Sequence, residues 1–291
     1  MGMRALTTVV AVLVWWAASA IAAEQASTLG AVVVTIWIDD APGRHPVVIF
    51  SHGFHGCATQ SRFLTEGLAA SGYLVIAPNH RDATCDGGSS HWSDPPEEKL
   101  GRPELWTDTV YRDRADDIFH IVDALRSGGP LGDRADLSLL ALAGHSLGGY
   151  TVLGLAGAWP SWKGLQVKAV LALSPYSQPF IRQGTLAGLT APVMYQGGTL
   201  DLGITPGVAR VSGAYDQSPK PKYSIEFAGA GHLAWTNINP KFQGSILAYS
   251  RAFLDHYVKG VPASAALTRR DDDVHLLKWS SELGDSDSQK P

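Results

Sequence analysis

The 291-residue chain has little charge and almost no cysteine. Charged residues make up 17% of it, the net charge is −4, and no basic run is longer than Arg269-Arg270. A nucleic-acid-binding domain presents a basic surface, so the composition argues against nucleic acid as a partner. With 45% apolar residues, the chain has the composition of a globular protein rather than a disordered one.

The apolar run at the N-terminus is too short for an ordinary membrane span. Arg4 precedes the apolar residues 5–16, and the small-residue stretch 17–23 contains A-x-A-like cleavage sites. This pattern is typical of a secretory signal peptide, with an uncleaved anchor as the alternative. We therefore expect residues 1–23 to be removed, the protein to be secreted or periplasmic, and no stable insertion into a membrane.

The chain has only two cysteines, Cys57 and Cys85, which excludes a disulfide-rich scaffold. Each follows an expected strand, at 47–51 and 73–77, and neighbouring parallel strands would bring the two loops together. We expect a disulfide, because an exported chain meets oxidising conditions. Two free thiols are the alternative, and the absence of a Cys-x-x-Cys motif argues against a metal pair.

Strands and helices are expected to alternate between residues 47 and 258. The expected strands, mostly short continuous apolar runs, lie at 31–38, 47–50, 73–77, 137–143, 168–173, 192–196 and 222–227. The expected helices lie at 61–70, 108–126, 147–158 and 242–258. This alternation predicts one α/β domain over residues 24–260, with a mostly parallel sheet and helices on both faces.

Two further segments complete this organisation. The connection 174–191 is too short to hold a large lid domain. Residues 261–291 are rich in polar and acidic side chains, and we expect them to form a loosely attached polar tail.

The motif Gly144-His145-Ser146-Leu147-Gly148 directly follows one of the buried strands. Its glycines permit a sharp turn from strand to helix that exposes one serine, the G-x-S-x-G nucleophile elbow. In a chain with 31 glycines the pattern alone is weak evidence. A serine nucleophile also needs a base, and the base needs an orienting acid.

Three histidines follow Ser146 in the chain: His232, His256 and His275. Only His232 lies in a loop directly after an expected strand, at the sheet edge where the elbow lies. We predict His232 as the general base, with a surface loop histidine as the alternative reading.

Three acidic residues lie between Ser146 and His232: Asp201, Asp216 and Glu226. Asp201 follows an expected strand and reaches the same sheet edge as the elbow, whereas Glu226 lies within a strand. We predict that Asp201 orients His232 and stabilises the imidazolium. Asp216 remains the second candidate.

The oxyanion hole of such a site needs two backbone N–H groups. We expect Leu147 to supply one at a helix N-terminus, and Phe54 to supply the other from the glycine-containing loop after the first buried strand. His52, His145 and Trp235 flank these positions and are candidate walls of a substrate pocket, with structural packing as the alternative.

His52 and His55 lie close together in the chain and could suggest a metal pair. No third ligand is evident in the sequence, so we predict no metal site.

The segments 48–53 and 144–149, the strand with Asp201, and Gly231-His232 resemble the serine esterases of the α/β-hydrolase fold. Within that fold the chain resembles the group of dienelactone hydrolases and platelet-activating-factor acetylhydrolases, and polyester hydrolases of the cutinase type are more distantly similar. The resemblance covers about residues 31–260.

This resemblance implies hydrolysis of carboxylic esters, small or lipid-like, through an acyl-enzyme and without a cofactor. An acyltransferase, a lipase or phospholipase, and a polyester hydrolase are alternatives with the same catalytic residues. A non-catalytic binding protein of this fold would commonly lack one of the three. The oligomeric state is not readable from the sequence.

Overall fold

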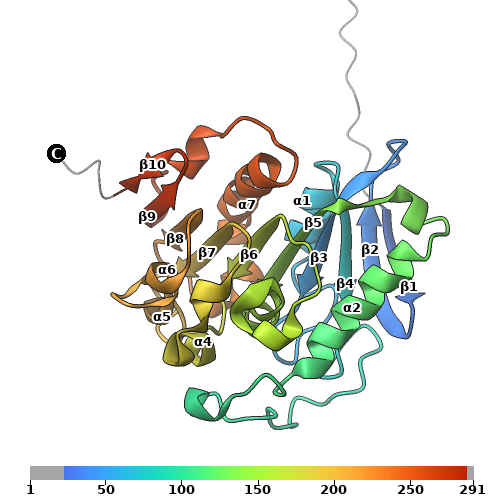
Figure 1. Cartoon of the computed structure of the whole chain (residues 1–291), viewed down its shortest axis with the longest axis horizontal. Coiled ribbons are helices and arrows are strands. Elements are labelled where there is room, and N and C mark those ends of the chain that lie inside the picture. Colours follow the sequence, from blue (N-terminus) through green and yellow to red (C-terminus); the bar gives the residue numbers. More distant parts are fainter. Residues whose placement is uncertain (1–22, 287–291) are drawn as a thin grey trace, which may run out of the picture.

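The computed structural model describes residues 23–286 and contains one ten-stranded sheet, with β1 and β10 at its opposite ends (Figure 1). The strands are β1 (Ala23–Leu29), β2 (Val32–Ile38), β3 (His45–Ser51), β4 (Leu74–Pro78), β5 (Ala135–His145), β6 (Ala169–Leu173), β7 (Val193–Gly198), β8 (Lys222–Phe227), β9 (Val274–Ser281) and β10 (Gly284–Asp285). Their order in the sheet is β1-β2-β4-β3-β5-β6-β7-β8-β9-β10. The expected signal peptide lies outside the described residues, except for Ala23.

The helices are α1 (Arg62–Ala69), α2 (Arg112–Arg126), α3 (Leu147–Leu153), α4 (Gln178–Gln183), α5 (Thr205–Ala209), α6 (Ala214–Gln217) and α7 (Gln243–Tyr257). The connection 174–191 holds only α4 and one short 3-10 turn, so it forms no large lid. Between residues 23 and 286, no helix has the length and apolar character needed to cross a membrane.

Six neighbouring strands, β3 to β8, are parallel, and the flanking strands pair antiparallel. Parallel neighbours need crossover connections, which place helices over both faces of the sheet. The fold class expected from the sequence is therefore confirmed.

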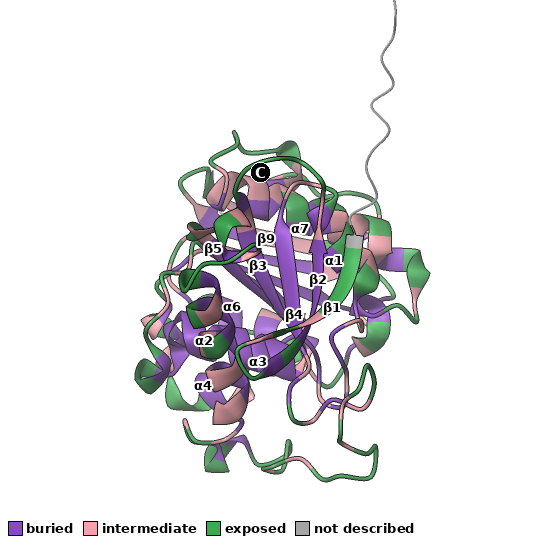
Figure 2. Ribbon diagram, turned by 90° about the vertical axis from the view of Figure 1, so that its right-hand side faces the viewer, coloured by how far each residue is buried: buried purple, intermediate pink, exposed green. Residues whose placement is uncertain are grey.

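Alternate residues of the central strands enter two different apolar layers. Val47 and Ile49 of β3 pack in the layer that includes residues of α2, α3 and α4. Val48 and Phe50 point to the opposite face, into the layer with α1 and α7. This alternation is the period of two that a β-strand imposes. Figure 2 shows the central strands buried, whereas β1 is mostly exposed.

Part of the C-terminal segment is firmly attached to the sheet. β9 pairs antiparallel with β8 along the length of β8 and buries Val274 and Trp279. The expectation of a loosely attached tail is therefore wrong for β9. Its few apolar residues stand among polar neighbours in the sequence, and they become a strand only because the edge of β8 is there to pair with.

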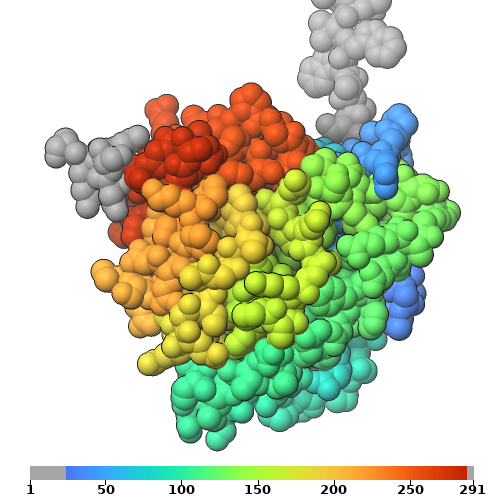
Figure 3. All heavy atoms as spheres, in the orientation of Figure 1, coloured from blue at the N-terminus to red at the C-terminus, as the bar shows by residue number. Residues whose placement is uncertain are grey.

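The long segment between β4 and α2 lies beside α4, at the lower border of the molecule in Figures 1 and 3. Gln183 Nε2 of α4 donates a hydrogen bond to the Trp106 carbonyl at 2.9 Å. The Tyr176 hydroxyl donates to the Leu100 carbonyl at 2.5 Å. These bonds hold the loop so that Leu100 reaches the cavity described below.

Candidate active site

Ser146 lies at the sharp turn between β5 and α3. Its φ of 55° is uncommon for a residue with a side chain, and its N–H donates to the Leu173 carbonyl at 3.0 Å. A Cβ on Gly148 would lie 1.9 Å from the Ser51 oxygen, and one on Gly144 would lie 2.3 Å from the Gly148 oxygen. Only glycine fits at these two positions, so the motif holds Ser146 on a strained elbow.

Ser146, His232 and Asp201 form a continuous hydrogen-bonded row. His232 Nε2 is 2.9 Å from Ser146 Oγ, and His232 Nδ1 is 3.2 Å from Asp201 Oδ1. The three residues follow the carboxyl ends of β5, β8 and β7, at one edge of the sheet. The alternative acid, Asp216, is not part of this row and lies 3.7 Å from Lys278 in an ion pair.

Ser174, which the sequence reasoning missed, joins this row directly after β6. Its hydroxyl donates to Asp201 Oδ2, and its Oγ lies 2.9 Å from His232 Nδ1. Since the hydroxyl has one proton, Oγ accepts from the His232 Nδ1–H. The position of Ser174 at the end of an expected strand is the signal that could have found it.

The Asp201 carboxyl is buried. Burial alone would raise its pKa, but hydrogen bonds from His232, Ser174 and Thr205 outweigh burial and hold the pKa of Asp201 below its ordinary value. The carboxylate is therefore ionised at neutral pH and can accept the His232 N–H.

The loop of residues 52–60, here named the oxyanion loop after the role expected of it, lies against Ser146. A Cβ on Gly53 would lie 3.4 Å from Ser146 Cβ. Phe54 and Leu147 line the same cavity as Ser146. Within residues 23–286, neither the Phe54 N–H nor the Leu147 N–H donates to another residue. Both amides are therefore free to donate to a charge that develops on the substrate.

His145 connects the oxyanion loop to the loop of His232. Gly53 N–H donates to Gln60 Oε1 at 3.0 Å, and Gln60 Nε2 donates to His145 Nδ1 at 3.0 Å. The proton of His145 is therefore on Nε2, which donates to the His232 carbonyl at 2.9 Å. Burial and the neighbouring His232 ring lower the pKa of His145 to about 3, so this ring is neutral at pH 7.

A cavity of about 500 Å³ opens beside Ser146. Besides Leu147, four aliphatic residues line it, and these are here named the apolar rim: Leu100, Leu200, Leu202 and Ile204. Leu200 and Leu202 are 65% and 76% exposed. Exposed leucines beside a cavity suit an apolar ligand, because covering them removes apolar surface from water.

The expectation that His52, His145 and Trp235 wall the pocket is not met. All three side chains are buried and none lines the cavity. Trp235 Nε1 donates to Gln196 Oε1 at 3.1 Å, and His52 Nε2 accepts the His80 N–H at 3.2 Å. Their polar atoms form hydrogen bonds that fix the ends of strands and loops behind the site.

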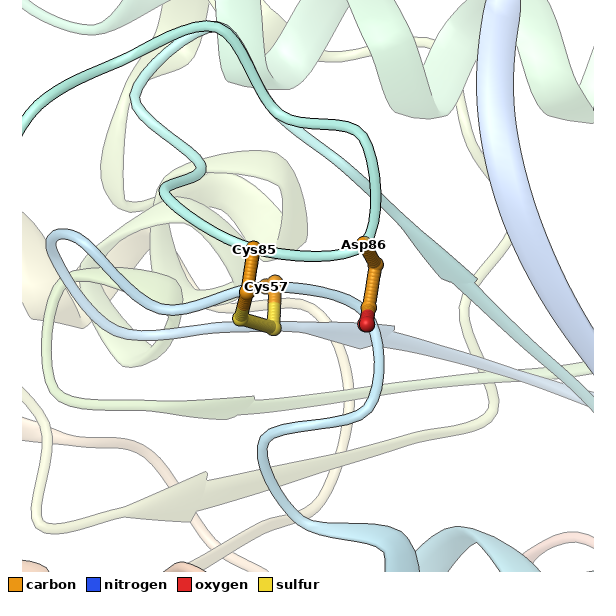
Figure 4. A group of neighbouring side chains, drawn as sticks. All are labelled: Cys57, Cys85 and Asp86. Carbon is orange, nitrogen blue, oxygen red and sulfur yellow. A yellow bond between two sulfur atoms is a disulfide. The ribbon is translucent and has the colours of Figure 1, made fainter.

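Cys57 and Cys85 form the expected disulfide between the loops that follow β3 and β4 (Figure 4). Asp86 lies beside the two sulfurs, so the three residues are close enough to resemble a metal site. Sulfurs joined to each other offer no thiolate to a metal, and Asp86 Oδ2 accepts from both the N–H and the hydroxyl of Thr59. The cluster is a structural tie at the base of the oxyanion loop.

A serine on a nucleophile elbow, in a mostly parallel sheet with helices on both faces, defines the α/β-hydrolase class. The profile of the family described as platelet-activating factor acetylhydrolase, isoform II, matches residues 6–117. This match covers β1 to β4, the oxyanion loop and the beginning of α2.

Curated relatives extend the similarity over 81% of the chain. Cutinase 2 of Thermobifida cellulosilytica is 28% identical over 240 residues, which are 78% of that protein. Cutinase cut1 of Thermobifida fusca is 28% identical over 240 residues, 64% of its length. Cutinase est1 of Thermobifida alba is 26% identical over 240 residues, 69% of its length. The chain is a serine esterase, that is, a carboxylic ester hydrolase with the α/β-hydrolase fold.

Proposed function

We propose that the chain is an exported esterase in which Ser146 is the nucleophile, His232 the general base and acid, and Asp201 the residue that orients His232. The observation that carries this proposal is the row of hydrogen bonds from Ser146 Oγ to His232 at 2.9 Å and from His232 to Asp201 at 3.2 Å. A hydroxyl with a positioned base and an orienting carboxylate is an activated nucleophile.

In this mechanism Ser146 Oγ attacks the acyl carbon, and its proton passes to His232 Nε2. The carbonyl oxygen becomes an oxyanion that accepts hydrogen bonds from the Phe54 and Leu147 amides. The intermediate collapses to the acyl-enzyme, and the alcohol leaves with the proton from His232. Water then attacks the acyl carbon with the same proton transfers, and the acid is released.

The apolar rim supports an ester whose acyl or alcohol part is apolar. Leu200 and Leu202 stand exposed beside the cavity, and the connection after β6 holds no large lid that would close over them. An open, apolar mouth also favours esters presented at a surface, such as a polyester, and the relatives from Thermobifida are cutinases. Polyester hydrolysis is therefore the second candidate function.

Two observations support export. Residues 1–23 have the pattern of a signal peptide, and the Cys57–Cys85 disulfide is a bond that persists in oxidising compartments. Both support the proposed periplasmic or extracellular location.

Ser146→Ala tests the proposal with p-nitrophenyl esters of increasing acyl length, run beside a polyester film. We expect hydrolysis of every ester to fall by at least about 10⁴-fold. Ser127→Ala, at an exposed serine after α2, is the matched control and should hydrolyse at the wild-type rate. Turnover by Ser146→Ala within tenfold of the wild type would rule the mechanism out.

A further inference from the structure

A fully buried cation lies behind the oxyanion loop. Arg114, in the first turn of α2, has a side chain with 0% exposure. Its Nε and Nη2 bind the two oxygens of Asp82, at 3.0 and 2.7 Å. Burial alone would raise the pKa of Asp82, but Arg114 holds it well below its ordinary value. A buried guanidinium is costly unless it is paired in this way.

The rest of the guanidinium binds the backbone of the oxyanion loop. Arg114 Nη1 donates to the His52 carbonyl at 2.8 Å, and Nη2 donates to the Gly53 carbonyl at 3.3 Å. Asp82 Oδ2 accepts the N–H of His55 at 3.3 Å. The ion pair therefore holds the loop on both sides of Phe54.

The Gly53 carbonyl and the Phe54 N–H are the two ends of one planar peptide group. Besides Arg114, the Gly53 oxygen accepts from the Gly56 N–H at 2.9 Å and from His52 Nδ1 at 2.7 Å. Donors at the carbonyl fix the plane of this peptide and so the direction of its N–H. They also withdraw electron density from the nitrogen, which strengthens the N–H as a donor. A charged donor has the larger effect.

We propose that Arg114 is a positioning residue for the esterase reaction, which orients and polarises the Gly53–Phe54 peptide so that the Phe54 N–H binds the oxyanion. This inference rests on the proposed function, in which Phe54 is an oxyanion donor. The substrate carbonyl gains its negative charge only on the way to the tetrahedral intermediate. The contribution of Arg114 therefore appears in kcat and not in KM.

The alternative to this proposal is that the Arg114–Asp82 ion pair only stabilises the fold. Such a pair changes the fraction of folded enzyme, but it leaves the turnover of each folded molecule unaltered. The test therefore counts active sites by titration with a fluorophosphonate and reports kcat per titrated site. A second readout is the Ki of an alkyl boronic acid, which forms a charged tetrahedral adduct with a nucleophilic serine.

Arg114→Gln removes the charge, and Arg114→Lys keeps it but loses the planar fork. For hydrolysis of p-nitrophenyl butyrate by Arg114→Gln we expect kcat per site to fall about 30-fold, with KM within about twofold. The boronic acid Ki should rise by a similar factor. Arg114→Lys should recover part of both losses. Arg112→Gln is the matched control, because Arg112 lies in the same turn of α2 and pairs with Asp116 without touching the loop.

Wild-type kcat per titrated site in Arg114→Gln would overturn the inference, as would a loss confined to KM. If Arg114→Gln does not fold, Arg114→Lys and Asp82→Asn take its place. Their kcat per titrated site and their KM are then compared with the wild-type values in the same way. Ser146→Ala distinguishes failure of the proposed function from failure of this inference. Activity retained by Ser146→Ala means that the proposed function fails, whereas an inactive Ser146→Ala beside a normal Arg114→Gln means that only this inference fails.

Discussion

The oxyanion loop and the apolar rim meet at Ser146, but different forces hold them. The loop is held by paired polar groups: the fully buried Arg114 behind it and its own half-buried Gln60 bind its backbone, and a disulfide ties it to the loop after β4. The rim presents aliphatic side chains, with Leu200 and Leu202 largely exposed. Fixed dipoles suit a charge that develops at one point, whereas exposed leucines can cover apolar groups of many shapes. We therefore expect the loop side to govern the reaction and the rim to govern the choice of ester.

The largest effect should come from removing the base that serves both sides. His232→Ala leaves Ser146 without a proton acceptor, and we expect kcat/KM for short and long esters alike to fall on the order of 10⁵-fold. Initial rates with p-nitrophenyl acetate and octanoate measure this loss. His91→Ala, at an exposed histidine outside the cavity, serves as the control. A loss of less than about a hundredfold would contradict the role of His232.

Removing the tie at the base of the loop should affect stability next most strongly. The disulfide spans a sequence separation of 28 residues, and closing a loop of that length stabilises a fold by about 3.5 kcal/mol. We expect Cys57→Ala/Cys85→Ala to lose about that free energy of unfolding, measured by urea denaturation. Dithiothreitol should destabilise the wild type by the same amount and leave the variant unchanged. Equal sensitivity of both proteins to the reductant would exclude the bond.

Because His145 is neutral in the folded protein, the stability of the fold should depend on pH. An unfolded histidine takes up a proton below about pH 6.5, whereas the pKa of folded His145 is about 3. Between these values the unfolded state binds the extra proton, so His145 makes the fold less stable as the pH falls. Glutamine can form the same two hydrogen bonds but cannot be protonated. Lowering the pH from 7 to 5 should therefore reduce the free energy of unfolding of the wild type by about 2 kcal/mol more than that of His145→Gln.

Urea unfolding of both proteins at several pH values measures this difference. A difference that stays constant over the range would mean that His145 takes up a proton as readily in the folded protein as in the unfolded one, and that its bond to Gln60 has been assigned wrongly.

The smallest effect should come from the rim, and it should depend on the ester. Leu200→Ser/Leu202→Ser removes apolar contact worth about 1 kcal/mol, so kcat/KM for the octanoate ester should fall about fivefold. Hydrolysis of the acetate ester should stay near the wild-type value. Val211→Ser changes an exposed residue that does not line the cavity and should alter neither rate. Equal losses for both esters would assign these leucines to the reaction instead of substrate choice.

Much of this arrangement could be predicted from local patterns. The short apolar runs predicted the parallel strands, and the chain order predicted which of three histidines and three acids would follow a strand to the edge near Ser146. The distances now bring Ser146, His232 and Asp201 together. Local patterns suffice here because each residue directly follows a strand, and parallel strands end at one edge.

Other parts of the structure depend on contacts between residues far apart in the chain, which no local sequence pattern indicates. Arg114 stands among acidic neighbours at the start of α2, which is the pattern of a solvated helix end, and only the fold brings it to Asp82 and Gly53. β9 forms because β8 offers an edge for pairing. His52, His145 and Trp235 lie near the candidate catalytic residues in the chain, but their side chains are buried behind the cavity and do not line it.

In the proposed mechanism Ser146 carries the acyl group during hydrolysis. Acid quenching of the enzyme within the first turnovers of a p-nitrophenyl ester, followed by peptide mass spectrometry, tests it most directly. We expect one acyl group per molecule, on the peptide that contains Ser146, and none in Ser146→Ala. Acylation of another residue, or hydrolysis without any covalent adduct, would contradict it.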